Sequence, residues 1–475
     1  MQFLAYACAV AILFNLSRAL AWRQGVLLLA SVGFLGFFSH DLRAFVPLAA
    51  FLLFGFVTLR LMRTGATFFF WPALVVVLAT FVWLKKYGFV PASLFLEHPY
   101  VTLGLSYILF RVLHLIIDAR SKYSTWPKRI GIVSYLNYTL NFTTLVAGPI
   151  QRYKEFASMQ LAVVPLELGL ATSGEALDRI VTGFFKVNVL SLFLSMIQAT
   201  ALNSLFAAHS AGPRLVAGAA VTGLYPFYLY CNFSGYIDIV IGIARFLRLK
   251  LPENFNRPFA AENYLIFWSR WHITLSTWIS IYVYTPLMVR FVKRWPAPGA
   301  EPFLAAAAYS VTFFLVGVWH GQTLMFLFFG FLLGLGMSVT KLYQAAMARW
   351  MGREAFQRLG ENSLYNTLAR GLTFTWCAFT LVWFWANWKQ MASMAHAVGW
   401  AGMAMIWAAV FLIGSTGLAG WEAARNWLLS YDFEGQPVVR SRYVRTSVVT
   451  AMLLIALVVV LLLNTPAPDI VYKTF

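Results

Sequence analysis

Residues 447–463 read SVVTAMLLIALVVVLLL, an apolar run without a charged side chain. A helix needs roughly 20 residues, with a range of about 17–25, to cross the hydrocarbon core of a bilayer. This run therefore predicts a membrane-spanning helix. Arg440, Arg442 and Arg445 precede it, whereas the residues that follow carry one Asp and one Lys. Because Lys and Arg are enriched in cytoplasmic loops, we expect residues 464–475 outside the cytoplasm.

Similar apolar runs recur along the chain and predict about eleven to twelve membrane-spanning helices in an all-α polytopic membrane protein. The first run lacks a basic segment before it and a small-residue cleavage site, so we expect a retained helix and no signal peptide. The runs before 447 lie at 3–20, 25–39, 43–62, 67–84, 101–117, 181–208, 214–246, 303–319, 322–340, 371–388 and 397–418.

Composition supports a chain that lies mainly in lipid. Hydrophobic residues make up 60% of it and charged residues 11%, with a mean hydropathy of +0.71, whereas soluble domains carry roughly a quarter charged residues. The formal net charge of +19 is spread over the segments between apolar runs. This distribution favours positive-inside topology over nucleic-acid binding. Basic residues follow runs one, three and five, so we expect the N-terminus outside the cytoplasm.

The sequence shows no internal repeat and no polar stretch as long as a soluble domain, so residues 1–475 are expected to form one membrane-embedded domain. Cys8, Cys231 and Cys377 lie in apolar stretches without metal-ligand spacing. We therefore expect these thiols to serve packing, and we predict no metal site.

Two regions are too polar or too irregular to be ordinary spanning helices. Residues 131–153 are apolar but contain several Asn and Thr residues and the break Gly148-Pro149. The backbone groups freed by that break need partners from protein or water, so we predict a re-entrant or interfacial element. Residues 250–290 contain charged side chains and Trp268, Trp271 and Trp278, which likewise exclude a lipid-facing span.

His320 lies in Trp319-His320-Gly321, where two strongly apolar runs meet. An imidazole at such depth is costly unless it faces a cavity or finds a partner. A neutral imidazole there can take a proton from an attacking hydroxyl group. We predict that Gly317 and Gly321 let a substrate approach the backbone closely. The alternative is a structural histidine that is hydrogen-bonded between helices.

His272 follows Arg270 and Trp271 and precedes Ser276. It is a candidate partner that orients an acyl carbonyl or the imidazole of His320, although a satisfied interfacial histidine fits the spacing nearly as well. His114 shares a helical face with Arg111 and Asp118, at i−3 and i+4. This trio predicts an intramembrane polar network, functional or structural. No nucleophile-elbow motif of hydrolases and no nucleotide-binding loop stands in a supporting sequence context. This disfavours hydrolases and nucleotide-driven pumps.

At these residues the chain resembles the membrane-bound O-acyltransferase family, in particular its bacterial branch of alginate O-acetylation and teichoic-acid D-alanylation subunits. The resemblance covers roughly residues 100–340, a core within the single domain. The matching motifs are Gly148 to Tyr153, Phe233-Ser234-Gly235-Tyr236 with Asp238, Pro252 to Asn256, Phe267 to Trp278, and Trp319 to Gly321.

The resemblance implies a ring of tilted helices around a thin core with a central tunnel. In that arrangement His320 is the essential catalytic residue and His272 its partner. Substrate contacts or tunnel positions are implied for Trp319, Gly321, Arg270, Trp271, Ser276, Asn232, Ser234, Asp238 and Arg152. One departure is that Ser280-Ile281-Tyr282 and Pro286-Leu287-Met288 replace the usual Arg-Asp-Tyr and Pro-Leu-Gly-Gly of alginate-type proteins. The donor side or the accessory partner is therefore expected to differ.

The tail 468–475, with Tyr472, resembles the aromatic tail of this branch, which implies a possible acyl relay at the Tyr472 hydroxyl. An interfacial tyrosine that anchors the last helix is the alternative. The resemblance further implies no bound cofactor, a cytoplasmic acetyl-CoA or carrier thioester as donor, membrane lipids around the chain, and location in the bacterial inner membrane. It also implies a periplasmic SGNH-type acetyltransferase partner and a surface polysaccharide as acceptor. Two alternatives remain open, a polysaccharide or lipid transporter or flippase, and a lipid-directed acyltransferase of the same family.

Overall fold

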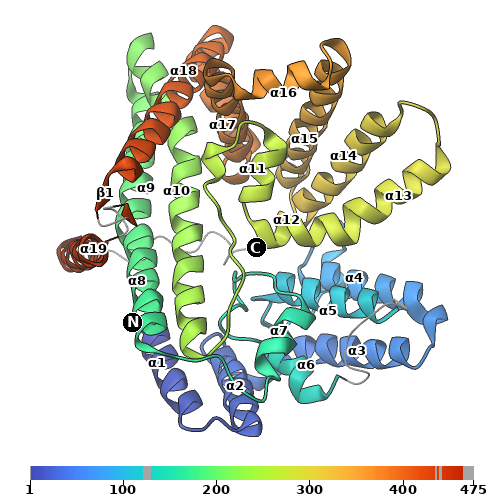
Figure 1. Ribbon diagram of the computed structural model, residues 1–475. Coiled ribbons are helices and arrows are strands. Elements are labelled where there is room, and N and C mark those ends of the chain that lie inside the picture. The colour runs from blue at the N-terminus through green and yellow to red at the C-terminus, as the bar shows by residue number, and fades with distance from the viewer. Residues whose placement is uncertain (1, 121–129, 434–435, 438–440, 464–475) are drawn as a thin grey trace. The chain divides into compact units, whose positions relative to one another are not determined.

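The computed structural model describes residues 2–120, 130–433, 436–437 and 441–463. Within them the regular structure is helical (Figure 1), apart from two short antiparallel strands, β1 (Asp432–Phe433) and β2 (Gln436–Pro437). The all-α prediction is confirmed.

Eight helical segments among the described residues are long and apolar enough to cross a membrane. The chain is therefore a multi-pass membrane protein. The segments are Leu42–Arg63, Thr67–Leu84, Leu170–Ala207, Ala211–Phe246, Glu301–His320, Leu324–Trp350, Trp388–Ser430 and Arg442–Leu463.

Four other apolar runs also form helices, but each of these helices is either too short or too polar to count as a candidate membrane span. The helices α1, α2 and α5 have 14, 16 and 16 residues, fewer than the roughly 20 that span a bilayer without local thinning. The helix α17 has 23 residues, but Asn366, Arg370 and several Thr and Trp residues lower its hydropathy. The number of apolar runs in the sequence is thus larger than the number of helices that are both long and apolar enough to span a membrane.

The chain divides into two compact units that interleave along the sequence. Among the described residues, the first comprises 2–120, 130–183 and 236–252, and the second 184–235, 253–433, 436–437 and 441–463. The long helix α10 (Ala211–Phe246) contributes to both.

The first unit is built from helices of modest length, and α3, α4 and α5 pack against one another in it. Its elements are α1 (Gln2–Asn15), α2 (Leu20–Leu35), η1 (Leu42–Phe45), α3 (Val46–Arg63), η2 (Thr67–Phe69), α4 (Phe70–Leu84), η3 (Ala92–Leu94), α5 (Leu105–Arg120), α6 (Ile132–Thr139), α7 (Tyr153–Gln160), most of α8 (Leu170–Phe185) and the end of α10.

The second unit contains most of the long helices. Its elements are the π-helix η4 (Lys186–Ser191), α9 (Leu192–Ala207), α10 up to Gly235, η5 (Pro258–Ala260), α11 (Tyr264–Arg270), α12 (Ile273–Ile279), the π-helix η6 (Ser280–Tyr284), α13 (Thr285–Arg294), α14 (Glu301–His320), α15 (Leu324–Trp350), α16 (Arg353–Glu361), α17 (Ser363–Trp385), α18 (Trp388–Ser430), β1, β2 and α19 (Arg442–Leu463).

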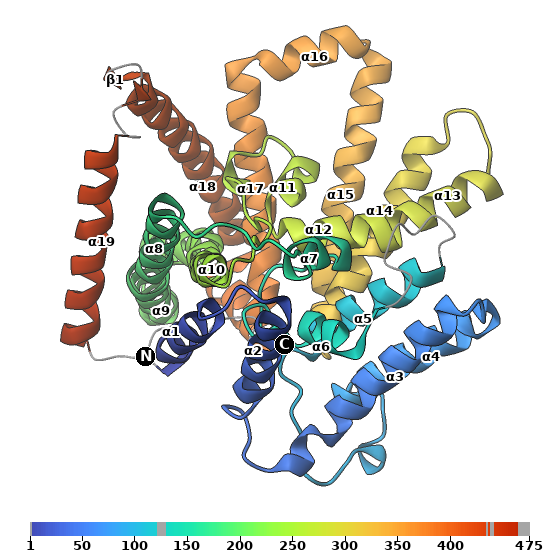
Figure 2. The ribbon, with the colours of Figure 1, turned by 60° about the horizontal axis from the view of Figure 1, so that its bottom comes forward.

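In this unit α15 and α17 are joined by α16, which runs across their ends (Figure 2). Small residues allow close helix contacts. A Cβ atom added to Gly334 would lie 2.9 Å from the Cα atom of Ser310, and one on Gly371 would lie 2.9 Å from the Cα atom of Ser415. Helix pairs in membranes associate through such small-residue contacts, so α14 packs on α15, and α17 on α18.

Both predicted irregular regions are present. Residues 131–153 form the short helix α6, a non-helical stretch and the start of α7. Residues 250–290 form α11, α12 and η6 around extended segments, where a spanning helix is absent. Asn141 and Thr144 of the first region and Asn254 and Thr274 of the second are buried inside protein, whereas Glu253 and Arg257 are exposed.

Candidate active site

His320 is the last residue of α14, immediately before the chain turns into α15. Its side chain is 3% exposed. Three aromatic rings surround the imidazole, with centroids 4.6 Å away for Trp319, 5.2 Å for Phe384 and 5.7 Å for Phe329. The predicted catalytic histidine is therefore buried in an aromatic pocket at the end of a candidate spanning helix.

The glycines beside His320 serve helix packing. A Cβ atom on Gly317 would lie 2.6 Å from the Cα atom of Gly330, and a Cβ atom on Gly321 would overlap the ring of Phe326. Substitution at either position therefore requires protein atoms to shift. The space beside them is filled by α15, and this differs from our expectation of an open approach for substrate, because the turn brings the two helices into contact.

His272 links α11 to α12 and is 1% exposed. Its backbone has φ 44° and ψ 52°, in the left-handed region. That conformation costs roughly 1–3 kcal/mol for a residue with a Cβ atom and persists only when neighbouring contacts enforce it. Such strained residues are concentrated at functional sites, which supports His272 as a site residue.

Asn254 holds this strained turn, and our sequence analysis did not single it out. Its backbone carbonyl accepts from Ile273 N–H at 2.9 Å. Its side-chain Oδ1 accepts from the N–H and the hydroxyl group of Thr274, at 3.1 and 2.6 Å. Asn254 is fully buried. The only sequence signal for this role is its place in the motif Pro252 to Asn256.

The two histidines lie close enough for their imidazoles to interact electrostatically. His272 also contacts Phe233 of α10, with ring centroids 5.0 Å apart. Burial lowers the pKa of His272 to about 3, so this imidazole is neutral at physiological pH and retains a basic nitrogen. The structure thus brings together two residues that are 48 positions apart in the sequence.

Other predicted residues of the second unit surround this pair. Trp271 is buried and stacks on Phe267 at 5.5 Å. The carbonyl of Arg270 accepts from Asn256 N–H at 2.9 Å. The Ser276 hydroxyl donates to the Trp271 carbonyl at 3.2 Å, and Ser276 lines a cavity of about 390 Å³ beside α12.

Asn232 and Ser234 of α10 are also buried. They flank Phe233, whose ring contacts His272. The α10 motif therefore reaches the candidate site through the phenylalanine, which our sequence analysis did not name as a site residue.

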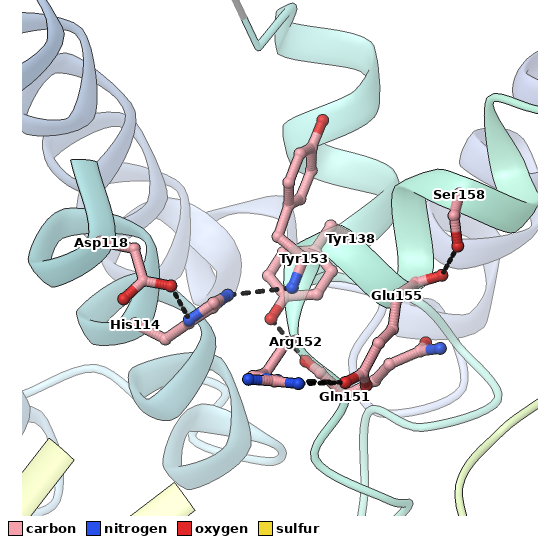
Figure 3. A network of polar contacts seen from close by, with 8 residues as sticks. All are labelled: His114, Asp118, Tyr138, Gln151, Arg152, Tyr153, Glu155 and Ser158. Atoms are coloured by element: carbon pink, nitrogen blue, oxygen red, sulfur yellow. Dashed lines mark hydrogen bonds and ion pairs between the residues drawn. The ribbon is translucent and has the colours of Figure 1, made fainter. Parts of the chain in front are cut away.

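In the first unit, His114 forms a structural network (Figure 3). Its Nδ1 lies 3.1 Å from Asp118 Oδ2, and its Nε2 accepts from the backbone N–H of Tyr153 at 2.9 Å. Because both ring nitrogens are engaged, the neutral imidazole carries its proton on Nδ1. This geometry favours the structural interpretation of the His114 trio: the imidazole fixes the first residue of α7.

Arg111, the third member of that trio, holds the irregular segment before α7. Its guanidinium group donates to the carbonyls of Tyr138, Thr139 and Thr144 at 3.1, 2.9 and 2.8 Å. It also donates to the hydroxyl group of Thr144 at 2.6 Å. Arg111 is 2% exposed. Backbone groups freed between α6 and α7 are thus satisfied by a buried cation, as a non-helical segment within a membrane requires.

Two of the remaining predicted residues, Arg152 and Asp238, belong to the first unit. Arg152 pairs with Glu155 at 2.8 Å on an exposed face of the first unit (Figure 3). Asp238, also in that unit, pairs with Arg179 at 2.9 Å. Tyr472 lies outside the described residues. Within the part of the chain that the structure describes, no three His, Cys, Asp or Glu side chains form a group able to hold a metal ion.

A family model for the membrane-bound O-acyltransferase family matches residues 64–384, a range that includes both histidines. The chain belongs to the membrane-bound O-acyltransferase family. It is accordingly an O-acyltransferase of a multi-pass membrane class, which favours the enzyme over the flippase alternative.

Several bacterial enzymes are similar to this O-acyltransferase. The teichoic acid D-alanyltransferase of Bacillus subtilis is 28% identical over 361 residues, which are 72% of this chain and 85% of that protein. The probable alginate O-acetylase of Pseudomonas syringae pv. tomato is 27% identical over 54% of this chain and 47% of its own length. The peptidoglycan O-acetyltransferase of Helicobacter pylori is 40% identical over 126 residues, 26% of this chain and 22% of that protein.

Proposed function

We propose that this O-acyltransferase takes an acyl group, most simply acetyl, from a cytoplasmic thioester and passes it across the inner membrane for O-acetylation of an extracytoplasmic polysaccharide. The observation that carries the proposal is a pair of buried imidazoles in the same unit, His272 and His320. The relatives include a peptidoglycan O-acetyltransferase and a probable alginate O-acetylase, which supports the acceptor class.

In the proposed reaction, an acceptor hydroxyl attacks the thioester carbonyl carbon, the new C–O bond forms and the C–S bond breaks. His320 accepts the hydroxyl proton, and the departing thiolate takes up a proton to leave as a thiol. His272 positions the carbonyl or the imidazole of His320. General-base catalysis of this kind contributes about 10²–10⁴-fold in rate. The aromatic pocket around His320 excludes water and limits hydrolysis of the thioester.

The side from which the donor enters follows from the distribution of charge. Arg290, Lys293 and Arg294 lie on α13, which precedes the start of α14, and Arg349 lies at the end of α15. Lys341 of α15 pairs with Glu301 at 3.2 Å, so these helix ends are neighbours. A basic surface of this kind favours the cytoplasmic side and attracts an anionic donor such as acetyl-CoA or a carrier-bound thioester.

A relay completes the proposal. If residues 464–475 lie outside the cytoplasm, the Tyr472 hydroxyl receives the acyl group and transfers it to a periplasmic SGNH-type acetyltransferase. That partner then acylates the polysaccharide. The thiol ester supplies the free energy of both transfers, so no further energy source is needed.

D-alanyl is the second candidate acyl group. The similarity to a teichoic acid D-alanyltransferase covers 85% of that protein. The donor would then be a D-alanyl thioester and the chemistry at His320 unchanged. The two candidates differ only in the acyl group, which a donor comparison resolves.

The test uses purified full-length protein in vesicles with radiolabelled acetyl-CoA or a D-alanyl carrier thioester. Label should accumulate on Tyr472, measured by peptide mass spectrometry, and His320→Ala should reduce it at least 100-fold. His40→Ala, at an exposed histidine of the first unit, is the matched control. Equal labelling in wild type and His320→Ala would refute the general-base role, and absence of label with either donor would refute the relay.

A further inference from the structure

A groove of about 1110 Å³ lies in the second unit, between α10, η5, α17 and α18. Its floor is aromatic, with Phe227, Phe259 and Phe374 in mutual ring contact at 4.9–5.7 Å. Its rim carries exposed apolar side chains, among them Val216 at 72% and Ile413 at 66%. This volume exceeds the roughly 300–1,000 Å³ typical of small-molecule sites.

One end of the groove is charged. Arg257, Glu422 and Arg425 line it there. Arg257 and Glu422 form an ion pair, so their charges offset each other. The Arg425 guanidinium group has one long hydrogen bond, 3.5 Å to Asn426 Oδ1, and no acidic partner among the described residues. Beside the Arg257–Glu422 pair, the charged end thus presents the guanidinium group of Arg425.

Aromatic residues place this end at the level of the lipid headgroups. Trp421, Trp427 and Tyr431, at the end of α18, are 67%, 59% and 51% exposed. Exposed Trp and Tyr side chains of spanning helices gather at the membrane interface. From Arg425 the lining residues of α18 extend back to Met405, which is about 30 Å of helix. The apolar part of the groove thus runs from the interface into the hydrocarbon core.

We propose that this groove binds an anionic glycerophospholipid, with its phosphate group at Arg425 and an acyl chain along the aromatic floor. A cation at headgroup depth above an apolar channel complements a lipid that has a negative head and a long tail. A free phosphate compound would use only the charged end, and a zwitterionic lipid would gain less from Arg425. This site is separate from the chemistry proposed at His320.

The groove also continues toward the candidate site. Phe259 on its floor contacts Trp271, with centroids 6.1 Å apart, and Trp271 directly precedes His272. A bound acyl chain therefore packs against rings that support the strained turn, so we expect lipid binding to raise thermal stability.

Two variants separate the parts of the site. Gly417 lines the groove, and a Cβ atom added there meets nothing within 4 Å, so the backbone accepts a side chain at this position and Gly417→Leu places one in the groove. Gly420 of the same helix is equally open but does not line the groove, which makes Gly420→Leu its matched control. Arg425→Gln removes the cation, and Lys389→Gln, at an exposed lysine in the first turn of α18, controls for loss of charge.

The experiment reconstitutes full-length protein in nanodiscs of equal phosphatidylglycerol and phosphatidylcholine, then measures by native mass spectrometry which lipids remain bound. Wild type should retain phosphatidylglycerol in excess. Arg425→Gln should lower that enrichment about fivefold, and Gly417→Leu should remove the bound lipid, with both controls unchanged. As a measurement that needs no variant, the wild-type Tm should rise with phosphatidylglycerol but not with glycerol phosphate.

Retention of both lipids in proportion to their abundance would overturn the proposal. So would equal losses in Gly417→Leu and Gly420→Leu, or recovery of a polyprenyl phosphate as the retained lipid from cell membranes. A Tm that rises equally with glycerol phosphate would assign the charged end to a soluble phosphate and refute the lipid.

Discussion

Asn254→Ala should disrupt the candidate active site although Asn254 bears no reactive group. The side-chain oxygen of Asn254 accepts two hydrogen bonds, from the N–H and hydroxyl groups of Thr274 at 3.1 and 2.6 Å. A buried donor that loses its acceptor costs about 1–3 kcal/mol. Loss of both bonds therefore costs about 2–6 kcal/mol. This is comparable to the roughly 1–3 kcal/mol that the left-handed turn at His272 requires, so the turn should relax.

The matched variant is Thr274→Val, which removes only the hydroxyl donor and should cost about 1 kcal/mol. The assays are thermal unfolding of the purified protein and acyl transfer from labelled donor. Asn254→Ala should show the larger drop in Tm and a loss of activity of at least tenfold, whereas Thr274→Val should retain most activity. Equal effects of the two variants, or an active Asn254→Ala protein with unchanged Tm, would refute the reasoning.

Two further predictions concern stability. Gly317→Ala should lower Tm by several degrees, because the new Cβ atom would lie 2.6 Å from the Cα atom of Gly330 and overpacking costs about 1–3 kcal/mol; Gly420→Ala, in open space, should not lower it. Acidification should destabilise the wild type, since His272 has a pKa of about 3 when folded and 6.5 when unfolded. The unfolded chain binds the proton first, so stability is complete above pH 6.5 and falls between pH 6.5 and 3; His272→Gln should flatten this slope in Tm measured against pH, and an unchanged slope would contradict the buried neutral imidazole.

Local sequence was sufficient to predict the elements of this fold. Apolar runs of membrane length become helices because only internally hydrogen-bonded backbone is stable in lipid, and every such run is helical in the structure. Apolar stretches interrupted by Asn, Thr and Pro, such as 131–153, were predicted to be irregular for the same reason, and they are. His320 could be singled out because an imidazole between two apolar runs is costly unless it faces a cavity or finds a hydrogen-bond partner.

Contacts between distant residues could not be predicted in this way. No sequence pattern shows that Asn254 enforces the turn at His272, or that Phe326 fills the space beside Gly321, because both depend on packing between separate segments. The motif of Arg111, His114 and Asp118 predicted a network. Only the structure shows that Arg111 donates hydrogen bonds to three backbone carbonyls, and that both ring nitrogens of His114 have polar partners.

The sequence alone thus determined that the chain is a bundle of membrane helices with a histidine at a helix junction, since hydropathy and helical length are properties of contiguous residues. Tertiary structure decided which side chains meet: His272 with Phe233, and Asn254 with Thr274. The physical reason is that burial and hydrogen-bond satisfaction are settled between segments, where sequence spacing carries little information.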